Sequence, residues 1–217
     1  MAELKRKATE TPRLKDGAHT PFAEAYRELR TNLEYQADTQ GVKSVLLAVP
    51  DEKSDHTVFA ENLARTMAVG NKNILLVDGD ISNKKLTLYM GLRPEEKGFT
   101  DVLQGHCRLA DAVKKCGTVS VLPAGTSVDD PAEVFAAGAE ALLRRLEEEY
   151  AAVLVTAPPV CRATDAVVLG RVVKGTIVLV EAGTVPQDCV QKCRDALLAV
   201  GANLLGAVLT DYDPKKI

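Results

Sequence analysis

The 217-residue sequence lacks several patterns that would place it outside the soluble globular class. No apolar run approaches the roughly 20 residues that a membrane-spanning helix needs. The first ten residues, MAELKRKATE, lack the apolar stretch of a signal peptide, so we expect a cytoplasmic protein. The formal net charge of −3 shows no excess of basic residues, and we therefore expect no nucleic-acid partner.

Paired cysteines are also missing. The five cysteines form no Cys-x-x-Cys pair, and an odd number fits reduced thiols better than a disulfide framework. Cys189 and Cys193 are four residues apart on an expected helix, but no histidine or second pair accompanies them. The sequence therefore predicts buried or idle thiols rather than a metal site.

Glycine is missing from the loop where the surrounding pattern calls for it. The segment 44–80 reads as apolar run, polar loop, helical pattern and second apolar run, which is a βαβ unit whose first loop normally carries the chemistry. A phosphate-binding loop needs glycines, so that backbone N–H groups can wrap the phosphates, and a lysine to reach the outer ones. This loop reads PDEKSDHT, with no glycine and with three carboxylates against one lysine, Lys53.

Short, β-branched, nearly all-apolar runs recur along the chain and fit strands buried on both faces of a parallel sheet. The expected strands cover residues 45–49, 74–77, 119–122, 152–155, 176–180 and 204–209. The expected helices cover residues 21–37, 57–69, 84–91, 99–115, 131–149, 163–173 and 186–200. This alternation predicts a three-layer α/β fold with a mostly parallel sheet. We expect a single domain over 21–217, after a polar tail (1–20) that is flexible or lies on the surface.

Two helix starts are marked by their residue types. Pro21 follows Thr20, and Pro131 follows Asp130 with Glu133 two residues later, which are favoured N-terminal arrangements.

A polar stripe runs along the first expected helix. Glu24, Arg27 and Arg30 are spaced by three, so they share one side of it. By itself this spacing is typical of a solvated face with one ion pair.

In the order of these segments, the chain resembles the cytoplasmic bacterial tyrosine kinases (BY-kinases, of the CpsD/CapB exopolysaccharide type). This family belongs to the MinD/ParA-like group of P-loop ATPases. The resemblance extends from Thr20 to about Tyr212 and rests on several boxes in the right order. They are the helix Phe22–Asn32 with its Glu-x-x-Arg-x-x-Arg motif, the Asp-x-Asp box at 78–80, the LPAG segment at 122–125 followed by DPAE at 130–133, and the APPV segment at 157–160 followed by TDA at 164–166.

The resemblance implies a P-loop NTPase-like fold and specific roles. Glu24, Arg27 and Arg30 would build a ring oligomer, and Asp78 and Asp80 would supply the metal site and the general base. The family associates with a membrane-spanning adaptor of the polysaccharide co-polymerase type, which would hold the protein at the inner face of the membrane. Tyr212 would be what remains of the family's C-terminal phospho-acceptor cluster.

Departures from the family pattern fall on its nucleotide-binding groups. Aligning Ala60–Ala64 with the family's AANLA puts Thr57 at the Walker A Ser/Thr and His56 at its lysine. The position of the family's Walker B aspartate is occupied by Thr156. The other departures are Ser82 and Lys84 for an arginine and a proline, Glu181 for an arginine, and Thr210 for an asparagine that contacts the base.

These departures predict a pseudokinase with no bound cofactor, which assembles with itself, an active paralogue or the adaptor and regulates polysaccharide production. Asp78 and Asp80 would then be polar residues that cap a turn at the end of a strand. The alternative is an active tyrosine kinase or ATPase with a divergent site. There Lys53 would replace the missing lysine, Thr57 and Asp78 would bind Mg²⁺ with ATP, and Tyr212 or a partner would be phosphorylated. A MinD/ParA-like positioning protein is a third reading.

Overall fold

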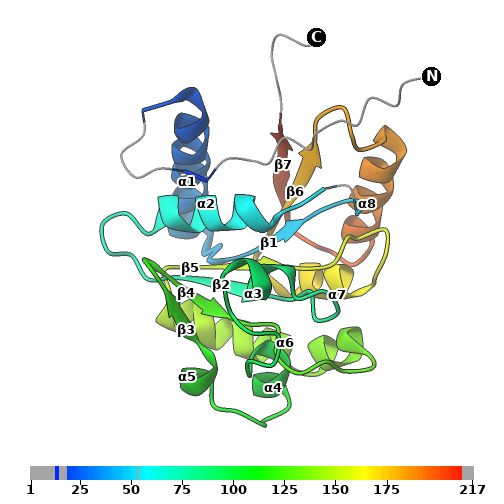
Figure 1. Ribbon diagram of the computed structural model, residues 1–217. Helices are drawn as coiled ribbons and strands as arrows, with labels where there is room; N and C mark the ends of the chain where they lie inside the picture. Colours follow the sequence, from blue (N-terminus) through cyan, green and yellow to red (C-terminus); the bar gives the residue numbers. More distant parts are fainter. Residues whose placement is uncertain (1–12, 15–18, 53, 212–217) are drawn as a thin grey trace, which may run out of the picture.

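The computed structural model describes residues 13–14, 19–52 and 54–211, and Figure 1 shows its arrangement. The strands are β1 (Ser44–Ala48), β2 (Ile74–Asp78), β3 (Lys114–Cys116), β4 (Val119–Leu122), β5 (Ala152–Thr156), β6 (Gly175–Glu181) and β7 (Leu204–Thr210). The helices are α1 (Pro21–Gln40), α2 (Thr57–Met67), α3 (Lys85–Tyr89), α4 (Phe99–Leu103), α5 (Leu109–Ala112), α6 (Pro131–Glu149), α7 (Asp165–Val172) and α8 (Gln187–Ala199).

The strands form one sheet in the order β3-β4-β2-β5-β1-β6-β7, parallel except for β3. Helices α1 and α2 cover one face, and α6, α7 and α8 cover the other (Figure 1). The central strands are buried on both faces: Leu46 packs into the cluster under α6–α8, and its neighbour Leu47 packs into the cluster under α1 and α2. The predicted three-layer, mostly parallel α/β fold is confirmed.

The two predicted helix starts are confirmed as capped ends. Thr20 Oγ1 accepts a hydrogen bond from the Ala23 N–H (3.1 Å), and Asp130 Oδ1 accepts one from the Glu133 N–H (3.1 Å). Each cap satisfies one of the backbone donors that the first turn of a helix leaves without a partner.

The single helix expected over 99–115 is wrong. The chain forms α4, turns at Gly105 (φ +73°), forms the short α5 and then adds the strand β3. Gly117 (φ +64°) closes a tight turn from β3 into β4, and the two strands pair antiparallel. Lysines at 114 and 115 hid β3 from a search for apolar runs, because an edge strand that is partly exposed needs no apolar sequence.

The expectation that every strand is buried on both faces is wrong for β7. This strand lies at the edge of the sheet, each of its residues is half-buried or exposed, and Leu209 is among the exposed large apolar side chains. Among the described helices none is long and apolar enough to cross a membrane.

Candidate functional site

The site lies at the carboxyl edge of the sheet, where β2, β5 and β1 end side by side. In register, Asp78 at the end of β2 faces Thr156 at the end of β5. Gly79 follows Asp78 and donates its N–H to the Thr156 carbonyl oxygen (2.9 Å). A Cβ at Gly79 would lie 2.5 Å from that oxygen, so the close approach of the two strand ends requires glycine here.

The loop after β1 leads into α2 without a phosphate cradle. The N–H of Thr57, the first residue of α2, donates to Asp55 Oδ1 at 2.7 Å. Burial acts against the Asp55 carboxylate, but this hydrogen bond and nearby positive charge lower its pKa. A helix N-terminus favours an anion, which in a phosphate-binding loop is the phosphate. Here the chain's own carboxylate takes that place. Lys53 lies outside the described residues.

Several polar atoms of the same loop are buried and have no hydrogen-bond partner among the residues that the structure describes. They are Ser54 Oγ, both ring nitrogens of His56 and Thr57 Oγ1. Burial lowers the pKa of His56 to about 4, although Asp55 and Asp80 act in the opposite direction. At neutral pH the imidazole is therefore uncharged, and His56 does not supply the positive charge of the lysine it aligns with.

Asp78 is fully buried and held by the protein itself. Its Oδ2 accepts hydrogen bonds from the N–H and the hydroxyl of Thr87 (2.8 and 2.7 Å), and its Oδ1 accepts one from the Asp80 N–H (3.1 Å). Burial raises the pKa of Asp78 to about 6, against the effect of these donors. The Thr87 hydroxyl in turn accepts from the Ala124 N–H (3.0 Å), so Asp78 connects β2, α3 and the segment after β4.

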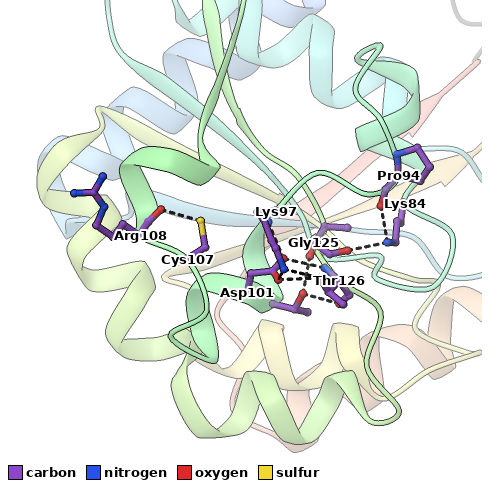
Figure 2. A network of polar contacts seen from close by, with 11 residues as sticks. Lys84, Pro94, Lys97, Asp101, Cys107, Arg108, Gly125 and Thr126 are labelled. Carbon is purple, nitrogen blue, oxygen red and sulfur yellow. Dashed lines mark hydrogen bonds and ion pairs between the residues drawn. The ribbon is translucent and has the colours of Figure 1, made fainter.

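Asp80 caps the turn that follows β2. Its carboxylate accepts hydrogen bonds from the backbone N–H (3.1 Å) and the side-chain amide (3.0 Å) of Asn83. Lys84 comes next with φ +53°, a conformation closed to the proline that stands there in the family pattern. Its Nζ donates to the carbonyl oxygens of Pro94 and Gly125, each at 2.8 Å (Figure 2). The turn after β2 therefore has a backbone conformation that a proline at position 84 could not adopt.

A network of hydrogen bonds around Asp101 of α4 lies beyond Lys84, at a corner of the fold where α4 meets the segment after β4. Asp101 accepts hydrogen bonds from Lys97 Nζ (2.8 Å), the Gly98 N–H (3.0 Å) and both the N–H and hydroxyl of Thr126 (2.9 and 2.8 Å), and Figure 2 shows this cluster beside Gly125. Burial opposes the charge, but these donors lower the pKa of Asp101 to about 2. The network fixes the segment after β4 against α4.

The charge around the loop is mainly negative. Asp165, the first residue of α7, is buried, and burial together with the carboxylates of Asp130 and Asp80 raises its pKa. Lys85, the first residue of α3, acts as a positive charge on Asp55 and on His56. Asp80 is therefore close enough to act on both His56 and Asp165, and the carboxylates that act on these two residues outnumber the one lysine, Lys85, that does so.

The stripe on α1 is split between solvent and the domain. Glu24 is 70% exposed and pairs with Arg27 Nη1 (2.6 Å). Arg30 instead reaches α2, where its Nη1 donates to the Thr66 carbonyl oxygen (3.3 Å). The predicted phospho-acceptor, Tyr212, lies outside the described residues.

A cluster at the N-terminal side escaped the sequence analysis. Arg13 donates to the Tyr89 hydroxyl (2.6 Å), which donates to Glu61 Oε2 (2.6 Å), and Leu14 N–H donates to Asn62 Oδ1 (2.9 Å). These two residues of the expected tail therefore contact α2 and α3. Neither Arg13 nor Thr87, the main partner of Asp78, stands in a recognisable motif, so only their placement in space shows their contacts.

Comparisons with known proteins agree with the fold. The kinase domain of the Escherichia coli tyrosine kinase ETK superposes with a TM-score of 0.82 at 23% sequence identity, over 96% of this chain and 87% of that one. Within the described residues, no group of three or more histidine, cysteine or acidic side chains is arranged to hold a metal ion.

Sequence comparison identifies the relatives. No family model matches the chain. The CapB protein of Staphylococcus aureus is 27% identical over 209 residues, which are 94% of this chain and 91% of the relative. Tyrosine-protein kinase YwqD of Bacillus subtilis is 30% identical over 196 residues, which are 86% of this chain and 80% of the relative. With this identity over four fifths of a tyrosine kinase, and with the kinase-domain fold, the chain belongs to the bacterial tyrosine-protein kinase family.

Proposed function

We propose that this chain is a non-catalytic member of its family, which holds no ATP·Mg²⁺ and works in capsular or exopolysaccharide synthesis by assembling with other proteins. The observation that carries the proposal is the Asp55 carboxylate on the N–H of Thr57, at the helix end where a kinase of this design would place a phosphate. A triphosphate would have to displace this carboxylate.

Charge supports the same conclusion. A triphosphate carries up to four negative charges and would meet Asp55, Asp80 and Asp165. Each carboxylate–phosphate pair at a separation of ~4 Å costs about 1 kcal/mol in water and several at lower effective dielectric. His56 is uncharged at neutral pH and gives no compensation.

The residues at the magnesium position do not fit the ion either. The Asp78 carboxylate, which the family pattern offers to the metal, is buried and accepts hydrogen bonds from Thr87 and Asp80. Thr156 stands where a second carboxylate would be and donates its hydroxyl to the Val77 carbonyl oxygen (3.3 Å). The first contributes to the fold and the second is no anion, so phosphoryl transfer would lack its metal.

Calorimetric titration of the purified, nucleotide-stripped protein with ADP·Mg²⁺ and ATP·Mg²⁺ tests the proposal. We expect no heat of binding up to millimolar nucleotide. A dissociation constant in the micromolar range would overturn the proposal. The double variant Asp55→Gly/His56→Lys removes the internal anion and adds a cation, and it should gain measurable binding of the nucleotide. The control variant Glu52→Gly should not.

Assembly is the positive half of the proposal and involves α1. Glu24 is exposed and pairs with the half-buried Arg27, and Arg30 bonds to α2 of its own chain. Glu24→Ala and Arg27→Ala should therefore reduce self-association, or capture by the cytoplasmic segment of a transmembrane polysaccharide co-polymerase, without unfolding the domain. Light scattering and pull-down measure these quantities. Unchanged oligomer size and unchanged capture in both variants would contradict an assembly role for this stripe.

A divergent active kinase is the second candidate, and one observation favours it. Ser54, His56 and Thr57 present buried polar atoms without partners, as a loop that awaits a ligand would. This candidate predicts transfer of labelled phosphate from ATP to tyrosine that disappears in Asp78→Ala.

A further inference from the structure

Three of the five cysteines meet at one place, between the segment after β5 and the start of α8. Cys161 is exposed, Cys189 is half-buried in the first turn of α8, and Cys193 is buried one turn later. The Cys161 Sγ lies 3.8 Å from the carbonyl oxygen of Cys189. Two cysteine residues 28 positions apart in the sequence are thus in contact, and both are at least partly exposed to solvent.

We propose that Cys161 and Cys189 form a dithiol site that a hydroperoxide oxidises to an intramolecular disulfide. The contact between the Cys161 sulfur and the backbone of residue 189 is what carries this proposal, since it brings the Cys161 thiol to the turn of α8 that bears the Cys189 side chain. The proposal does not depend on whether the protein binds nucleotide.

The other thiols are worse candidates for the same reaction. Cys193 is completely buried, and burial raises the pKa of its thiol to about 12, so it stays protonated and out of reach of a water-soluble oxidant. Cys116 lies in β3, at the opposite edge of the sheet from β6 and β7. Cys107 contacts the carbonyl of its neighbour Arg108, in the corner shown in Figure 2.

The chemistry balances with a hydroperoxide as the oxidant. The Cys161 thiolate attacks one peroxide oxygen, the O–O bond breaks, and the products are a sulfenic acid and water, or an alcohol from an alkyl hydroperoxide. The Cys189 thiolate then attacks the sulfenic sulfur, the S–S bond forms and hydroxide leaves as water after protonation. The two thiols lose two electrons and the peroxide gains two.

The surroundings of Cys161 make this reaction slower than that of an activated thiol. Partial burial raises the pKa of the Cys161 thiol. The neighbouring Cys189, Asp51 and Asp188 raise it further, whereas Lys192 lowers it. We therefore expect oxidation over minutes to hours at neutral pH rather than the rapid reaction of a thiol with a lowered pKa.

A disulfide here would act on the reworked loop. The Val160 N–H donates to the Val49 carbonyl oxygen (3.0 Å), and the Cys161 N–H donates to that of Pro50 (3.1 Å). Arg162 pairs with Glu52 at 2.5 Å. Because the segment 160–162 is bonded to the chain that leaves β1, a bond to α8 would tether the edge of the candidate site to a helix.

Peptide mapping after treatment with hydrogen peroxide tests the proposal. Cleavage after Lys192 separates Cys189 from Cys193, so trypsin distinguishes the two possible partners of Cys161. We expect a linked pair of the peptides 146–162 and 175–192, which a reducing agent separates. Cys161→Ser and Cys189→Ser should each abolish it, whereas Cys107→Ser should leave it unchanged.

Hydrogen exchange supplies a second readout of the tether. The backbone amides of 160–162 should exchange several-fold more slowly in the oxidised protein than in the reduced protein, and peroxide should have no such effect on Cys189→Ser. The proposal is overturned if native, peroxide-treated protein yields no 161–189 linkage, or if Cys161 is found linked to Cys193 instead.

Discussion

The buried polar residues that follow β1 and β2 differ in their hydrogen bonding. After β2, Asp78 and Asp80 accept hydrogen bonds from Thr87 and Asn83, and the Thr87 hydroxyl is itself bonded at both sides. After β1, the hydroxyls and ring nitrogens of the loop are equally buried but find no such partners within the described part of the chain.

The difference separates two uses of buried polarity. A buried polar group that is fully bonded contributes to one defined structure, whereas one left without a partner costs free energy and calls for a functional or historical explanation. By this criterion the Asp-x-Asp box contributes to the fold. The loop after β1 keeps polar groups that the fold does not use, and this is the observation that favours the divergent-kinase candidate.

The largest expected loss of stability concerns Asp101, another buried carboxylate that accepts several hydrogen bonds, as Asp78 does. Asp101→Ala would leave the buried Gly98 N–H and the partly buried Thr126 N–H without their acceptor and would break the ion pair with the exposed Lys97, and it should lower the free energy of unfolding by about 3–4 kcal/mol. Urea denaturation measures it. Asp111→Ala, which removes an exposed pair with Arg108, should cost no more than about 1 kcal/mol. Equal losses in both variants would show that the corner contributes no special stability.

A pair of threonines makes the comparison directly. Thr87→Val removes a hydroxyl bonded to Asp78 and Ala124 and should destabilise the protein by about 2–3 kcal/mol. Thr57→Val removes a hydroxyl that forms no well-aligned hydrogen bond with a described residue, although it lies near enough to help lower the pKa of Asp55, and should change stability by less than about 1 kcal/mol in either direction. If Thr57→Val proved as costly as Thr87→Val, the loop after β1 would not be the unsatisfied region described above.

The two regions should also respond oppositely to acid. The folded-state pKa of His56, about 4, lies below its unfolded value, so its contribution is present above pH ~6.5 and is lost as the pH falls towards 4. The folded-state pKa of Asp78, about 6, lies above its unfolded value, so its contribution is present below pH ~4 and is lost as the pH rises through 6.

Two variants separate these contributions. Relative to the wild type, His56→Gln should gain stability as the pH falls from 7 to 4, and Asp78→Asn should lose it, each by about 2 kcal/mol. Denaturation at pH 4, 5.5 and 7 gives the slopes. Parallel pH profiles for both variants and the wild type would refute the assigned protonation states.

The smallest effect concerns the carboxylate at the start of α2. Asp55→Ala removes the acceptor for the Thr57 N–H and should cost about 1 kcal/mol, as the loss of an N-terminal cap does. Glu52→Ala, which breaks the surface pair with Arg162, should cost less. A gain in stability for Asp55→Ala would mean that charge repulsion in the loop outweighs the hydrogen bond.

Much of the fold could be predicted from the sequence because its signals are local. Apolar strand runs and the caps at Thr20 and Asp130 depend on neighbouring residues, and both are present in the structure. The hairpin of β3 and β4 escaped prediction because Lys114 and Lys115 lie at a sheet edge, where burial does not select apolar residues.

The sequence by itself determined what the loop after β1 lacks. Whatever the conformation of the chain, this loop contains no glycine, and no lysine stands next to Thr57. Only the tertiary structure decided what the remaining residues do. It placed Thr87 on Asp78, turned Asp55 onto the start of α2, buried His56 until it lost its charge, and brought Cys161 to Cys189. Except for the contact between Asp55 and Thr57, which joins residues two positions apart, these outcomes depend on hydrogen bonds and burial between elements that are distant in sequence, and no local pattern encodes them.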